Sequence, residues 1–152
     1  VSMTVELYRE LSAHPRINGV KEASGDVALA ARTVAACGDS FNVWSGNDDQ
    51  IVPILSMGGS GVISVLSNVL PRKTVEICTR FWSGDVSGSA ALQCELLPLI
   101  HALFSEVNPI PVKAAMAALG FCEDYLRLPL TTMEPAHREV LLSCMRAQGL
   151  NA

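Results

Sequence analysis

Apolar residues in the first half of the chain recur with helical spacing in some segments and with strand-like spacing in others. The spacing over residues 2–14 predicts a helix with Ser2 as its N-cap and Pro15 just after its end. Three β-prone runs follow, each succeeded by a turn and a helical segment. The runs are 17–21, 41–45 and 61–65, and the helical segments are 27–37, 49–57 and 71–82.

This alternation predicts parallel βαβ units, in which the connecting helices cover a parallel sheet. The ends of the second helix agree with that prediction, because Asp26 precedes it at the N-cap and Gly38 follows it. From residue 85 onward the strands stop, and helical periodicity appears over 87–105, 111–120 and 135–148. We therefore expect an α/β part over residues 1–84 and a helical subdomain over residues 85–152.

Three parallel strands cannot close a barrel. A sheet of that size with helices on one side has two edges and one face that need cover. The pattern is therefore typical of a piece of a larger α/β structure.

The charge pattern narrows the class of partners. The formal net charge is -4 and no run is rich in lysine or arginine, so we expect no nucleic acid partner. The longest apolar candidate for a membrane span, residues 96–104, is interrupted by Pro98 and His101. The early charges of Glu6 and Arg9 do not fit a signal peptide. We expect a soluble cytoplasmic protein with no membrane partner.

The residues that commonly bind metals lack the spacing of a metal site. The five cysteines are odd in number and widely spaced, with no C-x-x-C pair, and the three histidines have no ligand-like spacing. Most of the cysteines lie in apolar segments, where cysteine behaves as a small buried hydrophobe. The glycine-rich run 58–61 precedes a strand instead of joining a strand to a helix, so it fits a turn better than a phosphate-binding loop.

Lys21 is the residue that most suggests chemistry, because it ends the first β-prone run. In α/β folds, ligands bind and reactions occur at the carboxyl ends of parallel strands. Partial desolvation there disfavours the ammonium ion, and the neutral amine can attack a ketone. The resulting imine is an electron sink, so a neighbouring proton can leave to give a nucleophilic enamine. The alternative is a lysine that extends to solvent and pairs with Glu22.

Five motifs carry a resemblance over the whole length of the chain. They are Gly19-Val-Lys-Glu-Ala-Ser-Gly-Asp26, Ser45-Gly-Asn-Asp48, Gly61-Val-Ile-Ser-Val65 with Asn68 and Pro71, Asn108-Pro-Ile-Pro-Val-Lys113, and Arg127-Leu-Pro-Leu130. In order and spacing they resemble the dihydrodipicolinate synthase family of pyruvate-activating Schiff-base enzymes. The stretch after Lys21 favours the synthases over the related sialic acid lyases and keto-deoxy sugar aldolases.

The resemblance implies a partial TIM barrel, with Lys21 on the sixth strand and with strands seven and eight at 41–45 and 61–65. The helical tail then matches the family's carboxy-terminal subdomain. The implied enzyme is a lyase that condenses pyruvate with L-aspartate 4-semialdehyde to 4-hydroxy-tetrahydrodipicolinate, on the route to diaminopimelate and lysine. It implies no metal and no organic cofactor, because pyruvate is activated as a covalent imine on Lys21.

The resemblance also assigns residues around the imine. By position, Ile63 should offer its backbone to the pyruvate, and Gly46 and Asn47 should line the pocket. Asn47 departs from the acidic residue often found there, a difference that bears on the contact with the second substrate. Without the resemblance, Ile63 would be an ordinary strand residue and Gly46 an ordinary turn glycine.

Several catalytic groups of the family are implied to lie outside this chain. They are the threonine pair that binds the pyruvate carboxylate, the proton-relay tyrosine, the arginine that receives the semialdehyde, and the lysine-feedback site. Tyr8 and Tyr125 fall in segments that do not match the relay tyrosine. We therefore expect a carboxy-terminal fragment that is weak or inactive alone, needs an amino-terminal half of the barrel, and forms homo-oligomers.

Two alternative functions stay open. The chain could belong to an aldolase that cleaves a keto-deoxy sugar acid or sialic acid by the same imine chemistry. It could also be a non-catalytic half-barrel that serves assembly through its exposed sheet and helices.

Overall fold

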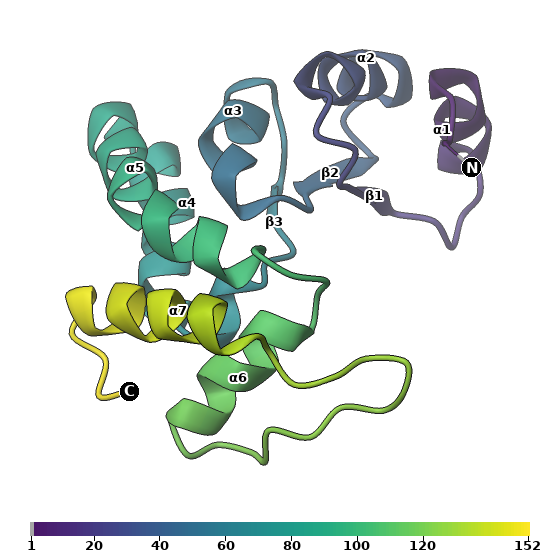
Figure 1. The fold of residues 1–152 in the computed structure, drawn as a ribbon. Coiled ribbons are helices and arrows are strands. Elements are labelled where there is room, and N and C mark those ends of the chain that lie inside the picture. The colour runs from purple at the N-terminus through teal and green to yellow at the C-terminus, as the bar shows by residue number, and fades with distance from the viewer. Residues whose placement is uncertain (1) are drawn as a thin grey trace. The chain divides into compact units, whose positions relative to one another are not determined.

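Three short strands form a parallel sheet in a computed structural model that describes residues 2–152. They are β1 (Gly19–Glu22), β2 (Asn42–Ser45) and β3 (Gly61–Val62). The strands are hydrogen-bonded in the order β1-β2-β3, with Lys21 opposite Trp44 and Trp44 opposite Gly61 (Figure 1). The prediction of parallel strands separated by helices is confirmed.

Residues 2–152 also form seven α-helices and two short 3-10 helices. The α-helices are α1 (Val5–Ser12), α2 (Val27–Cys37), α3 (Ile51–Ser56), α4 (Pro71–Trp82), α5 (Val86–Leu103), α6 (Ile110–Ala118) and α7 (Pro135–Ala147). The 3-10 helices are η1 (Asp48–Gln50) and η2 (Leu66–Asn68). The predicted bounds of α2 and α4 are confirmed, and those of α5, α6 and α7 differ by one or two residues.

Helix α2 begins and ends at the residues that signal its ends. At its start, the Asp26 side chain accepts a hydrogen bond from the backbone N–H of Leu29 (3.0 Å), one of the donors that a helix leaves unpaired. At its end, Gly38 has a φ of 72°, which costs glycine little because it has no Cβ. The Gly38 N–H donates to the carbonyl of Val34 (3.2 Å). Local chemistry therefore fixes the length of this helix.

Several predicted elements are shorter than expected, and the helix expected over 49–57 is divided into η1 and the short α3. Thr4, not Ser2, caps α1, because the Thr4 hydroxyl lies three residues before Leu7 and accepts from its N–H (3.3 Å). The third strand ends at Val62 instead of residue 65. Val62 pairs with Ser45, the last residue of β2, and the chain then turns toward η2.

The described chain consists of two compact units. One comprises 2–64 and Glu76–Gln93, and the other comprises Val65–Val75 and Cys94–Ala152. Helices α4 and α5 each contribute residues to both units. A compact unit of this chain is not the same as a subdomain of a complete barrel, so the expected boundary after residue 84 stays a prediction.

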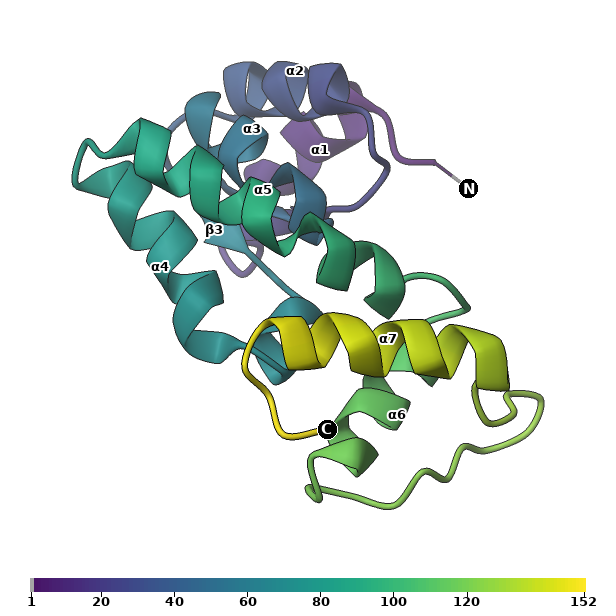
Figure 2. The same ribbon diagram turned by 60° about the vertical axis from the view of Figure 1, so that its left-hand side comes forward.

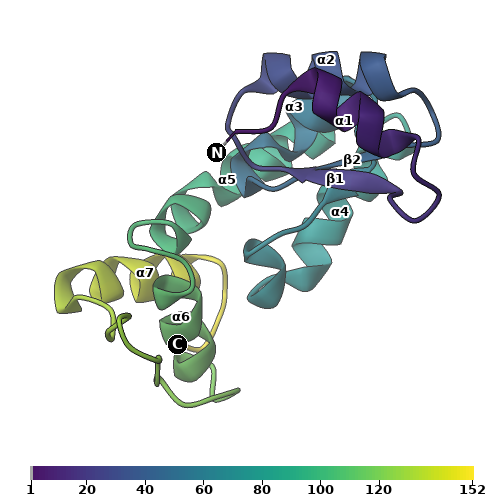
Figure 3. The same ribbon diagram turned by 90° about the vertical axis from the view of Figure 1, so that its right-hand side faces the viewer.

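In the first unit, helices lie over one face of the sheet. Figures 1 and 3 show α1, α2 and α3 on the same side of β1 and β2, and α2 and α3 both contact β2. Along β2, Val43 and Ser45 are buried whereas Trp44 between them is half-buried. Because successive strand residues point to opposite faces, Val43 and Ser45 face the helices and Trp44 faces away from them.

In the second unit, α6 packs against α7 (Figure 2). Alanines on α6 allow the two helices to approach closely, and larger apolar residues on α7 fill the contact. The residues of α6 and α7 with no exposed surface are Ala114, Ala115, Leu141 and Met145. Gly120 after α6 and Gly149 after α7 have positive φ, as expected from their predicted C-cap positions.

Helix α5 corrects the expectation that proline and histidine interrupt the longest apolar candidate for a membrane span. Its 18 residues have a mean hydropathy of 1.2, and by length and composition alone they could cross a membrane. Pro98 lies inside the helix without ending it, and Glu95 is the only aspartate, glutamate, lysine or arginine in the segment. Within the chain 44% of the segment is buried, and the core helix of a soluble protein passes the same test.

Removal of the Asp26 cap should weaken the first unit. Asp26→Ala leaves the Leu29 N–H without its side-chain acceptor, and we expect the free energy of unfolding to fall by about 1 kcal/mol. Asp26→Ser keeps a capping oxygen and should stay close to the parent. Urea denaturation followed by circular dichroism measures both variants, and equal losses would contradict the capping role.

The five thiols should differ in reactivity. Cys94 and Cys122 are exposed, whereas Cys78 is 5% exposed and burial raises the pKa of its thiol. The thiolate is the reactive form. Ellman's reagent at pH 8 should therefore modify Cys94 and Cys122 first and Cys78 only after denaturation. Peptide mapping of timed samples reads the order, and early modification of Cys78 in the native protein would contradict its assignment to the core.

Candidate active site at the carboxyl end of the sheet

Lys21 lies one residue before the end of β1, and its side chain is exposed. The register pairs Lys21 with Trp44, and residues paired in a parallel sheet point to the same face. Lys21 is therefore on the face turned away from α2 and α3, at the carboxyl end of the strand. This is the position that the sequence predicts for a reactive lysine.

A tryptophan fills the layer of the sheet that contains Lys21. A Cβ on Gly19 would lie 2.6 Å from the Trp44 ring, and a Cβ on Gly61 would lie 3.6 Å from it. The indole therefore occupies space that side chains at residues 19 and 61 would otherwise take. Lys21 is next to a wide, rigid group on its own face of the sheet.

Gly46 lies directly against the lysine side chain. A Cβ on Gly46 would come within 3.0 Å of the Lys21 Cε and within 2.5 Å of the Ala23 Cβ. The Gly46 N–H donates to the carbonyl of Glu22 (2.6 Å), which extends the strand pairing one residue beyond β1 and β2. The structure thus brings Lys21 and Gly46 together, and only a residue without a side chain leaves room for the lysine stem.

Ile63 is hydrogen-bonded to Ser45, the residue that precedes Gly46. Its N–H donates to the carbonyl of Ser45 (2.8 Å), so the strand pairing continues one residue past β3. The Ile63 side chain is 45% exposed. Because the N–H is already used, the backbone group that Ile63 could offer to a ligand is its carbonyl.

Asn47 points elsewhere in the turn after β2. Its Nδ2 donates to the Oε1 of Gln50 (3.4 Å) and lies 4.0 Å from the position that a Cβ on Gly25 would take. The Asn47 backbone is held by Ser45, whose hydroxyl donates to the Asn47 carbonyl (2.7 Å). Its amide is thus directed at Gln50 and the Gly25 turn, and a role for Asn47 in the pocket stays a prediction.

Side chains tie together the two turns that follow β1 and β2. The Nε2 of Gln50 donates to the carbonyl of Gly25 (3.1 Å), and the Ser45 hydroxyl also accepts from the Asn47 N–H (3.3 Å). Neither Gln50 nor Ser45 was expected from the sequence to act in this way. A serine two residues before a turn residue is a known local hydrogen-bonding pattern, so the signal for Ser45 was present.

Glu22 is the residue of the site that sequence reasoning missed. It follows Lys21 but points to the opposite face, where its side chain is only 5% exposed. Its Oε1 accepts from the Ser24 N–H (2.7 Å) and its Oε2 from the Tyr8 hydroxyl (3.5 Å). The alternative of a Lys21–Glu22 ion pair is therefore wrong, because Glu22 is buried under α1.

The pKa of the Tyr8 phenol is shifted where it lies against Glu22. Burial and, after it, the charge of Glu22 raise the pKa of the Tyr8 phenol, so the hydroxyl stays protonated and can donate to Glu22. Tyr8 is the buried residue of α1. The Tyr8 side chain thus connects α1 to the end of the lysine strand.

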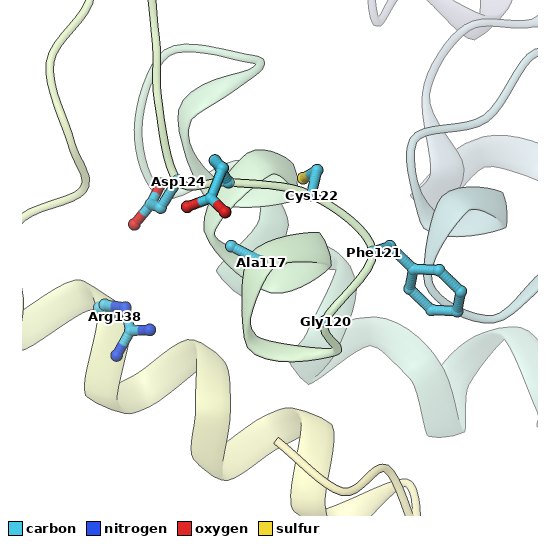
Figure 4. Close-up of a pocket in the computed structure, with 7 residues that line it drawn as sticks. Ala117, Gly120, Phe121, Cys122, Asp124 and Arg138 are labelled. Carbon is cyan, nitrogen blue, oxygen red and sulfur yellow. The ribbon is translucent and has the colours of Figure 1, made fainter.

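A hollow in the second unit contains other charged groups (Figure 4). Arg138 extends from α7 and Asp124 comes from the loop after α6, whereas the ring of Phe121 points away from both. Among the described residues, none forms a hydrogen bond with the buried Oδ1 of Asp124. None of the four predicted site residues lines this hollow; they are Lys21, Gly46, Asn47 and Ile63.

No metal centre is evident in the part of the chain that the structure describes. In residues 2–152, no group of three or more histidine, cysteine, aspartate or glutamate side chains is placed to hold a metal ion. At the sheet end the structure brings together the lysine stem and the bare backbone of Gly46. An amine in such a setting is suited to covalent chemistry with a carbonyl compound.

Comparison with known proteins gives a consistent result. The model of the dihydrodipicolinate synthetase family matches residues 1–148. A 4-hydroxy-tetrahydrodipicolinate synthase of Caldicellulosiruptor saccharolyticus is 51% identical over 146 residues, which are 96% of this chain and 49% of that protein. This chain thus spans about half the length of the curated relatives it matches.

Solved structures show the same fold. A dihydrodipicolinate synthase of Thermotoga maritima is 41% identical with a TM-score of 0.93, over 96% of this chain and 51% of that one. A chloride-inhibited synthase of Acinetobacter baumannii, solved in complex with pyruvate, is 31% identical with a TM-score of 0.93, over 99% of this chain and 52% of that one. The expected partial TIM barrel with a helical tail is confirmed, and the chain belongs to the dihydrodipicolinate synthetase family.

Proposed function

We propose that this chain carries the imine-forming part of a pyruvate-dependent Schiff-base lyase, with Lys21 as the nucleophile. The observation that supports this most is the lysine stem lying against the backbone of Gly46 at the carboxyl end of parallel strands. The family adds that the named relatives are 4-hydroxy-tetrahydrodipicolinate synthases. The synthase of Acinetobacter baumannii was solved with pyruvate, which supports the same first substrate here.

The reaction begins at the Lys21 Nζ. The neutral amine attacks the ketone carbon of pyruvate, and loss of water gives an imine that is readily protonated. The protonated imine draws electrons from the neighbouring methyl carbon, which loses a proton to become an enamine. That carbon then bonds to the aldehyde carbon of L-aspartate 4-semialdehyde, whose oxygen takes up a proton and becomes the 4-hydroxyl group. The amino group of the semialdehyde adds to the imine carbon, and cleavage of the bond from that carbon to Nζ releases the free Lys21 amine and the cyclic 4-hydroxy-tetrahydrodipicolinate.

Three further residues of this chain are proposed to shape the pyruvate site. Gly46 leaves room for the lysine and for the bound pyruvate, since its backbone approaches the Lys21 Cε closely. The Ile63 carbonyl is proposed to accept a hydrogen bond from the N–H of the protonated imine. Asn47 borders the site of the second substrate, a role that requires its amide to turn away from Gln50.

The chain alone should be a poor catalyst. Its lysine is exposed, whereas efficient imine chemistry needs a desolvated amine and groups that bind the carboxylate and move the proton. We propose that the amino-terminal half of the barrel supplies those groups and that the assembled protein is a cytoplasmic homo-oligomer. A keto-deoxy sugar acid aldolase would use the same imine chemistry, but the names of the relatives favour the synthase.

Borohydride trapping tests the proposal. The chain is co-expressed with the amino-terminal half of the Caldicellulosiruptor saccharolyticus synthase, incubated with pyruvate and reduced. We expect a reduced pyruvate adduct on Lys21, because only an imine is converted to a stable amine. Peptide mapping locates the adduct, and the two other lysines serve as internal controls. They are Lys73 and Lys113.

Lys21→Arg keeps the positive charge but cannot form the imine, so it should give no adduct. An unmodified Lys21 in the assembled wild-type protein would contradict the proposed function. It would favour the non-catalytic assembly module, which predicts association of the two halves without any adduct. Product analysis with L-aspartate 4-semialdehyde, set against cleavage of a keto-deoxy sugar acid, separates the two enzymes.

Gly46→Ala should impair the site through sterics. The added methyl would lie 2.5 Å from the Ala23 Cβ and 3.0 Å from the Lys21 Cε, so either the turn or the lysine must move. We expect the rate of adduct formation to fall by roughly 10- to 100-fold. The double variant Gly46→Ala with Ala23→Gly removes the shorter clash and should recover part of the rate. An unchanged rate in the single variant would contradict the proposed role of Gly46.

A further inference from the structure

We propose that Glu22 is a positioning residue for Lys21, acting from the opposite face of the sheet. The inference rests on the proposed function, because it concerns the rate at which Lys21 forms its imine. Glu22 does not touch the lysine amine. Its effect would pass through the backbone that the two neighbouring residues share.

The first argument is the burial of a carboxylate where an apolar residue would ordinarily lie. Glu22 is paired with the fully buried Ser45 and is itself 5% exposed, on the face that packs against helices. A buried carboxylate is costly unless hydrogen bonds compensate for the lost water. Both of its oxygens have such partners, which are the Ser24 N–H and the Tyr8 hydroxyl.

The second argument is the set of elements that meet at Glu22. Its side chain fixes the turn after β1 through Ser24, whose hydroxyl in turn accepts from the N–H of Asp26, the cap of α2. The Glu22 carbonyl accepts from the Gly46 N–H (2.6 Å). Glu22 thus links α1, the turn before α2, and the glycine that lies against the lysine.

The third argument is the alternation of side chains along a strand. Lys21 and Glu22 share a peptide bond, so rotation of the Glu22 backbone redirects the Cα–Cβ bond of Lys21. The lysine amine is at the end of a flexible stem, and its approach to a ketone depends on where that stem starts. A carboxylate held by the short bond from Ser24 (2.7 Å) and the longer one from Tyr8 (3.5 Å) restricts the movement of this origin.

A nearby hollow supports a contribution of Glu22 through its hydrogen bonds and not through the volume of its side chain. Tyr8, Glu22, Ala23 and Ser24 line an open hollow of about 510 Å³ together with residues of the α1 and α2 starts. Shortening Glu22 would enlarge this existing hollow instead of leaving a sealed cavity in the core. The loss would therefore be felt mainly through the hydrogen bonds.

Trapping kinetics can separate positioning from folding. The assembled protein is mixed with saturating pyruvate and quenched with borohydride over time, which gives a rate constant and a final fraction of modified Lys21. A purely structural role for Glu22 would lower the fraction of competent protein without changing the rate constant. A positioning role lowers the rate constant and keeps the final fraction.

We expect Glu22→Ala to slow adduct formation by roughly 10-fold or more with the final fraction preserved. Glu22→Gln keeps an acceptor for Ser24 and should be slowed less, and it serves as the test if the alanine variant does not fold. Tyr8→Phe removes only the second hydrogen bond and should be slowed least. Glu10→Gln, an exposed carboxylate change on α1, is the matched control and should match the wild type.

The outcomes distinguish this inference from the proposed function. If the wild-type protein forms no adduct, the proposed function itself is contradicted. If the wild type forms the adduct and Glu22→Ala and Glu22→Gln react with its rate constant, the positioning role is overturned while the function stands. The same holds if these variants lose only the final fraction.

Discussion

Two backbone hydrogen bonds beyond the strand ends hold the candidate site together. The Gly46 N–H reaches the Glu22 carbonyl and the Ile63 N–H reaches the Ser45 carbonyl, so the parallel ladder runs on after the regular strands have stopped. These bonds place the segments that follow β1, β2 and β3 side by side at the carboxyl end of the sheet. Without them, a lysine, a glycine and an isoleucine that are distant in sequence would not share a site.

The same ladder decides which residues face which side. Because neighbouring residues on a strand alternate, Lys21 and Glu22 are separated by the sheet although they are bonded to each other. One side of the strand end thus presents the Lys21 amine, for which we propose imine chemistry, and the other side holds a buried carboxylate that is hydrogen-bonded to Tyr8 of α1. Function and anchoring lie one residue apart, and this arrangement requires a short strand with a rigid turn after it.

Much of this could be predicted from the sequence where the signal is local. Asp26 and Gly38 set both ends of α2, and Pro71 sets the start of α4. The motifs around Lys21 predicted the family and the strand end. Prediction failed for the third strand because a long-range contact decides its length: it ends where its partner strand ends. It failed for the start of α1 because two nearby hydroxyl residues could cap the helix, and Thr4 instead of Ser2 accepts from the Leu7 N–H.

The burial and hydrogen bonds of Glu22 were the least accessible from the sequence. A charged residue next to a reactive lysine looks like its ion-pair partner, and only the alternation of faces reveals that the two point apart. The side-chain direction of Asn47 was equally hidden, because it depends on Gln50 in the same turn. Local hydrogen-bond competition of this kind leaves little trace in the spacing of residues.

The register of Trp44 has an optical consequence. Its indole lies opposite Lys21 in the sheet, so the two side chains are separated by about one strand spacing, roughly 4.8 Å between backbones. Conversion of the amine to a charged, conjugated imine alters the electric field at that ring. The emission of Trp44, one of the two tryptophans of the chain with Trp82, would thus report the imine proposed for Lys21 without any added dye.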